Sequence, residues 1–222
     1  MKRSFATTTL YGAAAAALIG FSTTAAAAFN GYYIGSAWQT IRTVGTGGSV
    51  DLTSAPVSVT LKGSDNQSNL STMLLWYNTA PAVFADPNDK KVSFSWGYKT
   101  EDQGGSSPDF YPGFDPAGFF VGALPDMPSD TGVVGLSTPS DISGGGVGAK
   151  MQGGTASFDV MPGQKFGFFV YSEDNLFGGA ELTISDFSAP LPASSPLPVP
   201  EPESIALLAL GFLGIAATRK NR

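Results

Sequence analysis

The clearest hydrophobic pattern in the chain is a strict alternation over residues 91–99. Large apolar side chains there take every second position, and serine or glycine fills the positions between them. A period of two residues is typical of a β-strand with one face against a core. The segment therefore predicts a strand that buries one set of four side chains: Val92, Phe94, Trp96 and Tyr98.

Similar strand signals recur along the middle of the chain, separated by clusters of Gly, Pro, Asn and Asp. No segment between them sustains the 3.6-residue period of an amphipathic helix. Many short strands joined by such turns are typical of a sandwich. We expect an all-β fold, a single jelly-roll-like β-sandwich with almost no helix, from the alternating segments 57–62 and 181–187, the doubly apolar segment 165–172 and the weaker segments 38–44 and 73–77.

The first 28 residues differ from the middle of the chain. Lys2 and Arg3 precede an apolar run of about a dozen residues, and alanines at 25–28 follow it. This order of charge, apolar run and small residues is that of a secretory signal peptide, and the run is too short for a lasting membrane span. We expect residues 1–28 to be a signal peptide removed after Ala27 or Ala28, with an amphipathic N-terminal helix as the alternative.

The C-terminal end has three parts in order. Residues 189–203 are rich in Pro and Ser, residues 204–218 are almost entirely apolar, and residues 219–222 are basic. We expect an extended stalk, a short transmembrane helix and a cytoplasmic tail, with the stalk facing outward. The residues that define this arrangement are Val199, Pro200, Glu201 and Pro202 in the stalk and Arg219, Lys220 and Arg222 in the tail.

This arrangement resembles the PEP-CTERM sorting signal of Gram-negative bacteria that make exopolysaccharide. The resemblance implies that an exosortase, a membrane protease, recognises Pro200, Glu201 and Pro202 and cuts near them. The alternative is a permanent membrane anchor behind a Pro-rich linker. Residues 50–190, best over 155–190, also resemble a group of uncharacterised β-sandwich passengers of such signals. That second resemblance implies a β-sandwich fold and export of the protein, and it identifies no catalytic residue.

Composition narrows the functions open to the passenger, residues 29–188. The chain has no Cys and no His, which excludes thiolate chemistry, Ser–His triads and most zinc sites. Five of its 12 basic residues and two of its 18 acidic residues lie in the terminal segments, so the passenger carries a net charge of about −9. Nucleic acid and anionic membrane surfaces are therefore not expected partners, and we expect no enzymatic activity.

Calcium is the one cofactor for which the sequence offers candidate ligands. Ca²⁺ takes six to eight oxygen ligands, and exported acidic β domains can supply them from loops. Two turns are candidates, one with Asp86, Asn88 and Asp89 and the other with Glu173, Asp174 and Asn175, to which Asp109 or Asp115 could add a carboxylate. The alternative is that these side chains are solvated turn formers without a metal.

The segment 107–120 concentrates aromatic residues among Pro and Gly. Exposed rings on such a loop can stack on sugar rings, so Phe110, Tyr111 and Phe114 form a candidate ligand site. The alternative is that the rings close one end of the core.

Taken together, the sequence predicts an exported surface or matrix protein with a structural or adhesive role, associated with exopolysaccharide or other matrix proteins. A calcium-braced, lectin-like module is the alternative.

Overall fold

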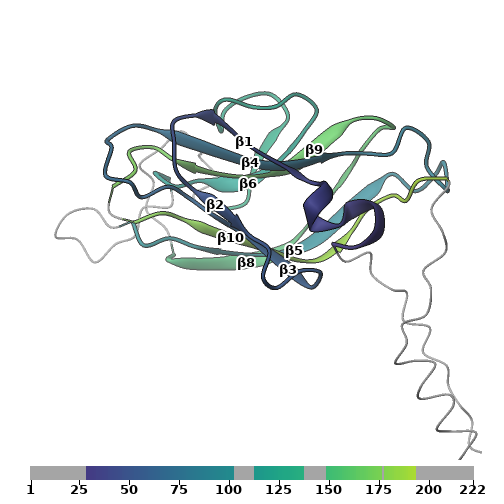
Figure 1. Ribbon diagram of the computed structural model, residues 1–222, viewed down its shortest axis with the longest axis horizontal. Coiled ribbons are helices and arrows are strands. Elements are labelled where there is room, and N and C mark those ends of the chain that lie inside the picture. The colour runs from purple at the N-terminus through teal and green to yellow at the C-terminus, as the bar shows by residue number, and fades with distance from the viewer. Residues whose placement is uncertain (1–28, 103–112, 138–148, 177, 194–222) are drawn as a thin grey trace, which may run out of the picture.

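The computed structural model describes residues 29–102, 113–137, 149–176 and 178–193, which form a sandwich of two five-stranded antiparallel sheets (Figure 1). The predicted signal peptide, transmembrane helix and basic tail lie outside these residues. The first sheet contains β1 (Gln39–Val44), β4 (Thr72–Thr79), β9 (Lys165–Ser172), β6 (Ala117–Val121) and β7 (Val133–Gly135), in this order. The second contains β2 (Ser49–Asp51), β3 (Ser58–Lys62), β10 (Glu181–Ser188), β5 (Lys91–Lys99) and β8 (Met151–Asp159).

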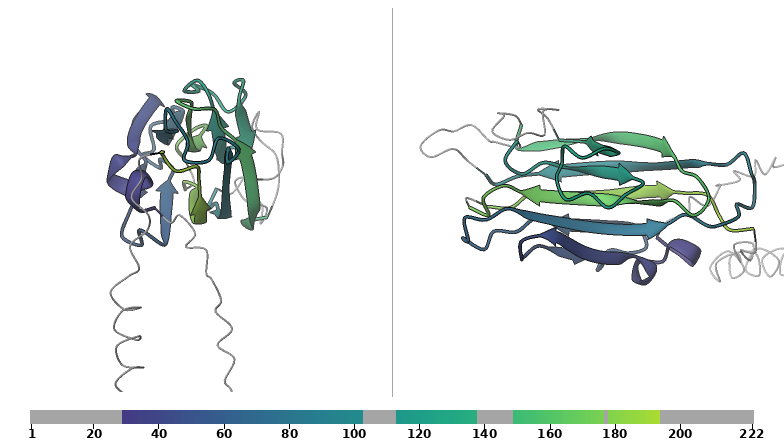
Figure 2. Two further views of the ribbon diagram at one scale, coloured as in Figure 1. Left: turned by 90° about the vertical axis from the view of Figure 1, so that its right-hand side faces the viewer. Right: turned by 90° about the horizontal axis from the view of Figure 1, so that it is seen from above.

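The strand order confirms the predicted sandwich and gives its connectivity. Strands β3 to β10 are divided between the two sheets. In the second sheet they have the order β3-β10-β5-β8, and they face the order β4-β9-β6-β7 in the first sheet. This arrangement of eight strands in two sheets is that of a jelly roll. β1 and β2 extend one edge of each sheet, and the two layers are visible in Figures 1 and 2.

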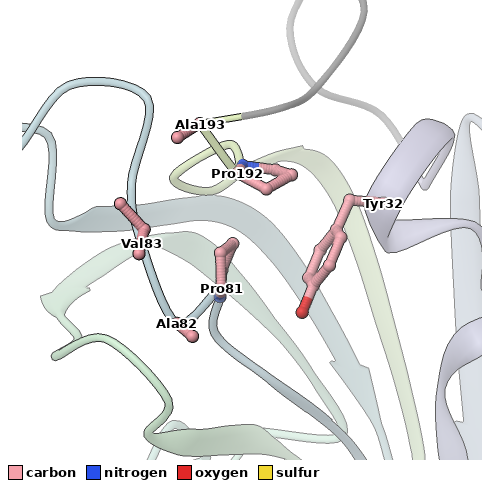
Figure 3. Close-up of a pocket in the computed structure, with 6 residues that line it drawn as sticks. All are labelled: Tyr32, Pro81, Ala82, Val83, Pro192 and Ala193. Atoms are coloured by element: carbon pink, nitrogen blue, oxygen red, sulfur yellow. The ribbon is translucent and has the colours of Figure 1, made fainter.

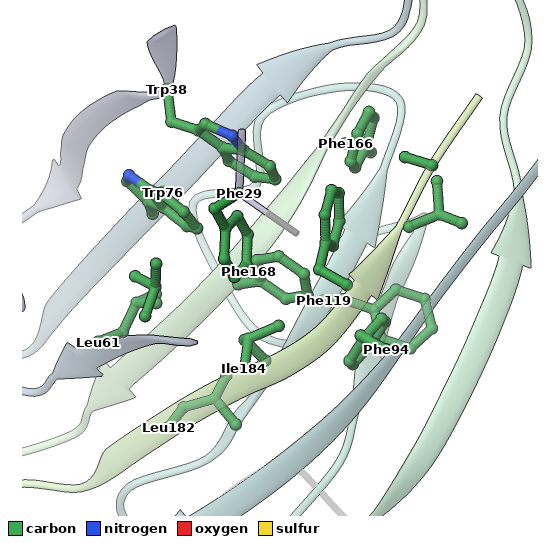
Figure 4. Close-up of a cluster of buried hydrophobic side chains, with 14 of the residues drawn as sticks. Phe29, Trp38, Leu61, Trp76, Phe94, Phe119, Phe166, Phe168, Leu182 and Ile184 are labelled. Atoms are coloured by element: carbon green, nitrogen blue, oxygen red, sulfur yellow. The ribbon is translucent and has the colours of Figure 1, made fainter. Parts of the chain in front are cut away.

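The core lies between the sheets and is built mainly from aromatic rings (Figure 4). The alternation over 91–99 works as predicted for Val92, Phe94 and Tyr98, which are buried, whereas Trp96 is half-buried beside the edge strand β8. Phe168 in β9 makes an edge contact with Phe94, with ring centroids 5.0 Å apart. Offset and edge contacts of this kind add to the free energy gained by burying the rings.

The outer face of the first sheet is buried as well. Leu75, Phe120 and Phe169 form a second apolar cluster on that face, against which Leu124 and Val133 pack from the β6–β7 connection and β7. The predicted doubly buried strand at 165–172 is therefore confirmed. The aromatic segment 107–120 is not all loop: its last residues belong to β6 and are core.

The first described residues close one end of the sandwich. The described chain contains two short 3-10 helices, η1 (Gly31–Tyr33) and η2 (Gly35–Ala37), and no α-helix. Three aromatic residues from this segment are buried between the sheets. Trp38 stacks on Trp76 with centroids 4.1 Å apart, and Phe29 stacks on Phe187 at 4.8 Å. The N-terminal segment is thus part of the core.

Candidate functional site

The outer face of the second sheet is covered by hydroxyl side chains and is here called the hydroxyl face. Residues at alternate positions of its strands, such as Val59, Phe94 and Ile184, are buried between the sheets, so their neighbours point outward. The members of the hydroxyl face are Ser58, Thr60, Ser93, Ser95, Thr155, Ser157, Thr183 and Ser185.

Strand register aligns these hydroxyls in rows across the sheet. Ser58, Ser185, Ser95 and Thr155 lie opposite one another on four neighbouring strands. Strands are about 4.8 Å apart, so this row spans about 14 Å. In the next row the hydroxyls of Thr60 and Thr183 are 2.8 Å apart and hydrogen-bond to each other. The face therefore presents donors and acceptors at regular spacing.

One part of the hydroxyl face forms a shallow hollow of about 420 Å³, here called the polar hollow. It lies beside a β-bulge, where the register of β10 against β5 shifts between Ser185 and Ser188. Asp186 lies in this bulge with φ 48° and is exposed at the edge of the hollow. The lining consists of Lys91, Ser93, Phe94, Ser95, Thr155, Ala156, Ser157 and Asp186.

A second, apolar hollow of about 480 Å³ lies at the end of the sandwich (Figure 3). The Tyr32 ring faces Pro81 and Pro192 across it, and its hydroxyl donates a hydrogen bond to the carbonyl oxygen of Thr79 at 3.2 Å. The Ala193 amide donates to the carbonyl oxygen of Val83 at 3.0 Å, which fixes the opposite wall. The ring is 39% exposed, so it can stack on a ligand.

A third hollow, of about 320 Å³, adjoins this one. It shares Ala82 and Val83 with the Tyr32 hollow and continues to Pro87, Pro162 and Lys90. Lys90 precedes Lys91, which lines the polar hollow. The adjacent lysines thus connect the polar hollow of the second sheet with the apolar hollows at this end of the molecule.

Two buried carboxyl groups lie elsewhere, in the interior of the sandwich. Asp102 and Asp115 are 2% and 1% exposed, and the Thr100 hydroxyl donates a hydrogen bond to Asp115 Oδ2 at 3.2 Å. Burial raises the pKa of Asp115 well above its ordinary value, and the neighbouring charge of Asp102 raises it further. These acids line none of the three hollows described above.

The predicted calcium ligands form two separate turns. Asp86 Oδ1 accepts a hydrogen bond from the Asn88 amide at 2.8 Å, and Asp174 Oδ1 accepts one from the Leu176 amide at 2.9 Å. These are local turn bonds of the kind expected for Asp without a metal. Asp86, Asn88 and Asp89 follow the Thr79 end of β4, whereas Asp174 lies near its Thr72 end, about 25 Å away. Within the described residues, no three acidic side chains are grouped so that they could hold a metal ion.

The predicted aromatic site is only partly visible. Phe110 and Tyr111 lie outside the described residues, so their role as ligand contacts stays a prediction. Phe114 is half-buried, and its carbonyl oxygen accepts a hydrogen bond from the Glu173 amide at 2.8 Å. Phe119 and Phe120, at the end of the same segment, are buried.

The remaining evidence concerns the C-terminal segment. A family model described as the PEP-CTERM protein-sorting motif matches residues 198–220. The chain carries a PEP-CTERM sorting motif. The motif implies that the protein is exported, that an exosortase processes it, and that it is a surface protein. The predicted motif residues Val199, Pro200, Glu201 and Pro202 and the basic Arg219 and Lys220 lie within the match. No helix in the described part of the chain is long and apolar enough to cross a membrane.

Two further comparisons add little to this result. The search of curated proteins found no match. Among solved structures, the chain matches TmCBM61 in complex with beta-1,4-galactotriose, with a TM-score of 0.33 and 11% sequence identity. The match covers 72% of this chain and 93% of that one. A likeness at this score transfers no ligand to the PEP-CTERM protein.

Sequence reasoning missed the polar hollow. Its signal was present in the segment 181–187, where apolar residues at 182 and 184 are followed by Phe187 rather than by an apolar residue at 186. Such a slip of one position in a period of two marks a bulge. The alternation over 91–99 identified Ser93 and Ser95 only as residues on the polar face of a strand.

Proposed function

We propose that the exported domain is a non-enzymatic surface or matrix protein that binds a neutral, hydroxyl-rich polysaccharide at the polar hollow. The observation that carries the proposal is the convergence there of a carboxylate, an ammonium group and four hydroxyls, from Asp186, Lys91, Ser93, Ser95, Thr155 and Ser157. A carboxylate accepts two hydrogen bonds from adjacent hydroxyls, and an ammonium group donates to ring or hydroxyl oxygens.

The Tyr32 hollow suits the other chemistry of a sugar, the apolar face of its ring. Tyr32 is exposed and held in place by its bond to Thr79, so it loses little side-chain entropy when a ring stacks on it. The open, shallow shape of the hollows favours an extended polymer over a small ligand enclosed on all sides. The net charge of about −9 favours a neutral polymer over an acidic one.

Two further facts support a binding role without catalysis. The chain lacks His and Cys, and Asp115, whose pKa is raised by burial, is buried together with Asp102 away from the three hollows. Among the described residues that line the polar hollow, Asp186 is the one carboxylate. Glycosidases of the usual kind need two carboxyl groups facing one cleft.

The test is binding of the processed protein, recovered after export, to exopolysaccharide purified from the source bacterium. We expect Ser95→Ala to weaken binding about fivefold and Asp186→Asn about tenfold, since neutral and charged hydrogen bonds differ in strength. Asn tolerates the positive φ of Asp186. Ser58→Ala is the matched control, because Ser58 lies in the same row as Ser95 and outside the hollow.

The assay is run with calcium and with a chelator. Loss of binding in the chelator would show that binding depends on a metal ion held by the acidic turns. Equal binding in both conditions would show that calcium has no role in it. Absence of binding in both conditions overturns the proposal. Equal losses for Ser58→Ala and Ser95→Ala would show that the hollow is not the site.

A further inference from the structure

The edge strand β8 lacks the features that normally keep sheet edges from pairing. An edge strand presents unpaired backbone groups, and proteins protect such edges with bulges, charges, Pro or very short strands. β1 has a bulge between Arg42 and Val44, and β2 and β7 have three residues each. β8 has nine residues in unbroken register with β5, and no described strand pairs with its other side.

The composition of β8 gives its edge little protection against pairing. Its sequence, MQGGTASFD, has no Pro and only one charge, Asp159 at its last position. The centre of the strand consists of small residues, from Gly153 to Ser157, which do not obstruct an approaching backbone. In a domain with a net charge of about −9, an edge whose one carboxylate lies at its last position adds little electrostatic repulsion between two copies.

We propose that β8 pairs with β8 of a second copy of this chain, antiparallel and about a two-fold axis at Thr155. Full overlap of residues 151–159 places Thr155 opposite its own counterpart and Asp159 opposite Met151 of the other copy. A parallel pairing in register would instead place the two Asp159 carboxylates side by side, which is unfavourable. The antiparallel pair is symmetric, so each contact is made twice.

The pairing joins two second sheets into one sheet of ten strands. Alternate residues of an antiparallel edge exchange two hydrogen bonds each, so nine residues form about eight bonds across the axis. The contact area is small for a permanent dimer, and we expect weak association that matters at the high local concentration of a cell surface. The two hydroxyl faces then form one continuous surface.

The test measures the mass of the processed protein by sedimentation velocity up to about 1 mM, the range in which millimolar affinities are detected. We expect the native protein to form dimers, and Thr155→Lys and Thr155→Glu each to be monomeric, because like charges then face each other at the axis. An equimolar mixture of these two variants should form dimers again. Thr40→Lys on β1, an exposed threonine on another edge strand, is the matched control and should leave the dimer intact.

A covalent readout comes from the absence of native cysteine. Cross-strand partners have Cβ atoms about 5 Å apart, so Thr155→Cys should give a disulfide-linked dimer on mild oxidation, whereas Thr40→Cys should not. A native protein that stays monomeric at every concentration overturns the proposal. So does a dimer that both charged Thr155 variants leave unchanged. Neither result depends on polysaccharide binding.

Discussion

Phe29 provides a sharp test of whether the start of the exported domain belongs to its core. The ring is 1% exposed, lies 4.8 Å from the Phe187 ring and 5.3 Å from the Trp76 ring, and its amide donates to the carbonyl oxygen of Pro56. Figure 4 shows it among the core side chains. Cleavage of the signal peptide at the predicted site would leave this residue at or next to the new N-terminus. Terminal residues normally fray, whereas this residue is buried in the core.

The perturbation is Phe29→Ala. Removal of a buried Phe side chain destabilises proteins by about 3–5 kcal/mol, through lost transfer free energy and the cavity left behind. That is about a fifth or more of the roughly 5–15 kcal/mol that stabilises a typical domain. For a domain of this size, 1 kcal/mol shifts the melting temperature by about 2–4 °C, so we expect a fall of about 6–20 °C. Phe29→Leu keeps most of the volume and should recover more than half of the loss.

The assay is thermal and urea unfolding of the processed protein, followed by tryptophan fluorescence, because Trp38 and Trp76 both contact the Phe29 ring. Mass spectrometry establishes that each variant has the same N-terminus. Ile34→Ala is the control: Ile34 lies five residues later and is 50% exposed, and its truncation should change stability by less than about 1 kcal/mol. If Phe29→Ala melts within 2 °C of the native protein, the N-terminal segment is not part of the core and the reasoning fails.

Three other predictions concern packing, pH and processing. Gly118→Ala should destabilise by about 1–3 kcal/mol in urea unfolding, because its Cβ would lie 2.1 Å from the Val134 carbonyl oxygen, whereas Gly97→Ala, with open space, should be neutral. The pKa of Asp115 is raised in the folded protein, so its protonated form stabilises the fold below the pKa of the unfolded chain, and this stabilisation is lost as pH rises. Asp115→Asn should therefore raise the free energy of unfolding at pH 7 and leave it unchanged at pH 3. Peptide mass spectrometry of the surface protein should find no peptide containing Arg222, and its persistence would indicate a permanent anchor.

The local alternation of the sequence was sufficient to predict the strands that have one face in the core and one in solvent. β5 is the example: a single pattern over nine residues gave its bounds and its buried face. β8 was largely missed, since Gly153 and Gly154 carry no side chain and an edge strand buries little apolar area. β6 was read as loop because its aromatic residues follow Pro and Gly, and pairing with β9 overrides that local preference.

The candidate site was harder to predict because it depends on register. Ser95 and Thr155 are 60 positions apart, and only the pairing of β5 with β8 makes them neighbours. Sequence reasoning looked for rare residue types, acids and aromatics in loops, whereas the hollow uses serines and threonines that any solvent-facing strand carries. The sorting motif was found because recognition there depends on contiguous residues.

The two proposals make one joint prediction that neither makes alone. Pairing through β8 would place two polar hollows on one continuous face, so a long polymer could occupy both while a short oligosaccharide fills one. A second contact on the same polymer acts at a high effective concentration and can strengthen binding by about 10²–10⁴-fold.

Thr155 lines the hollow, so either charged variant alone alters the site as well as the pairing. The mixture of Thr155→Lys and Thr155→Glu has the same altered hollows but regains the dimer. We therefore expect the mixture to bind the polymer at least about tenfold more tightly than either variant alone, and short fragments no more tightly. Equal affinity of the mixture and the separate variants for the polymer would show that pairing, even if it occurs, does not serve polysaccharide binding.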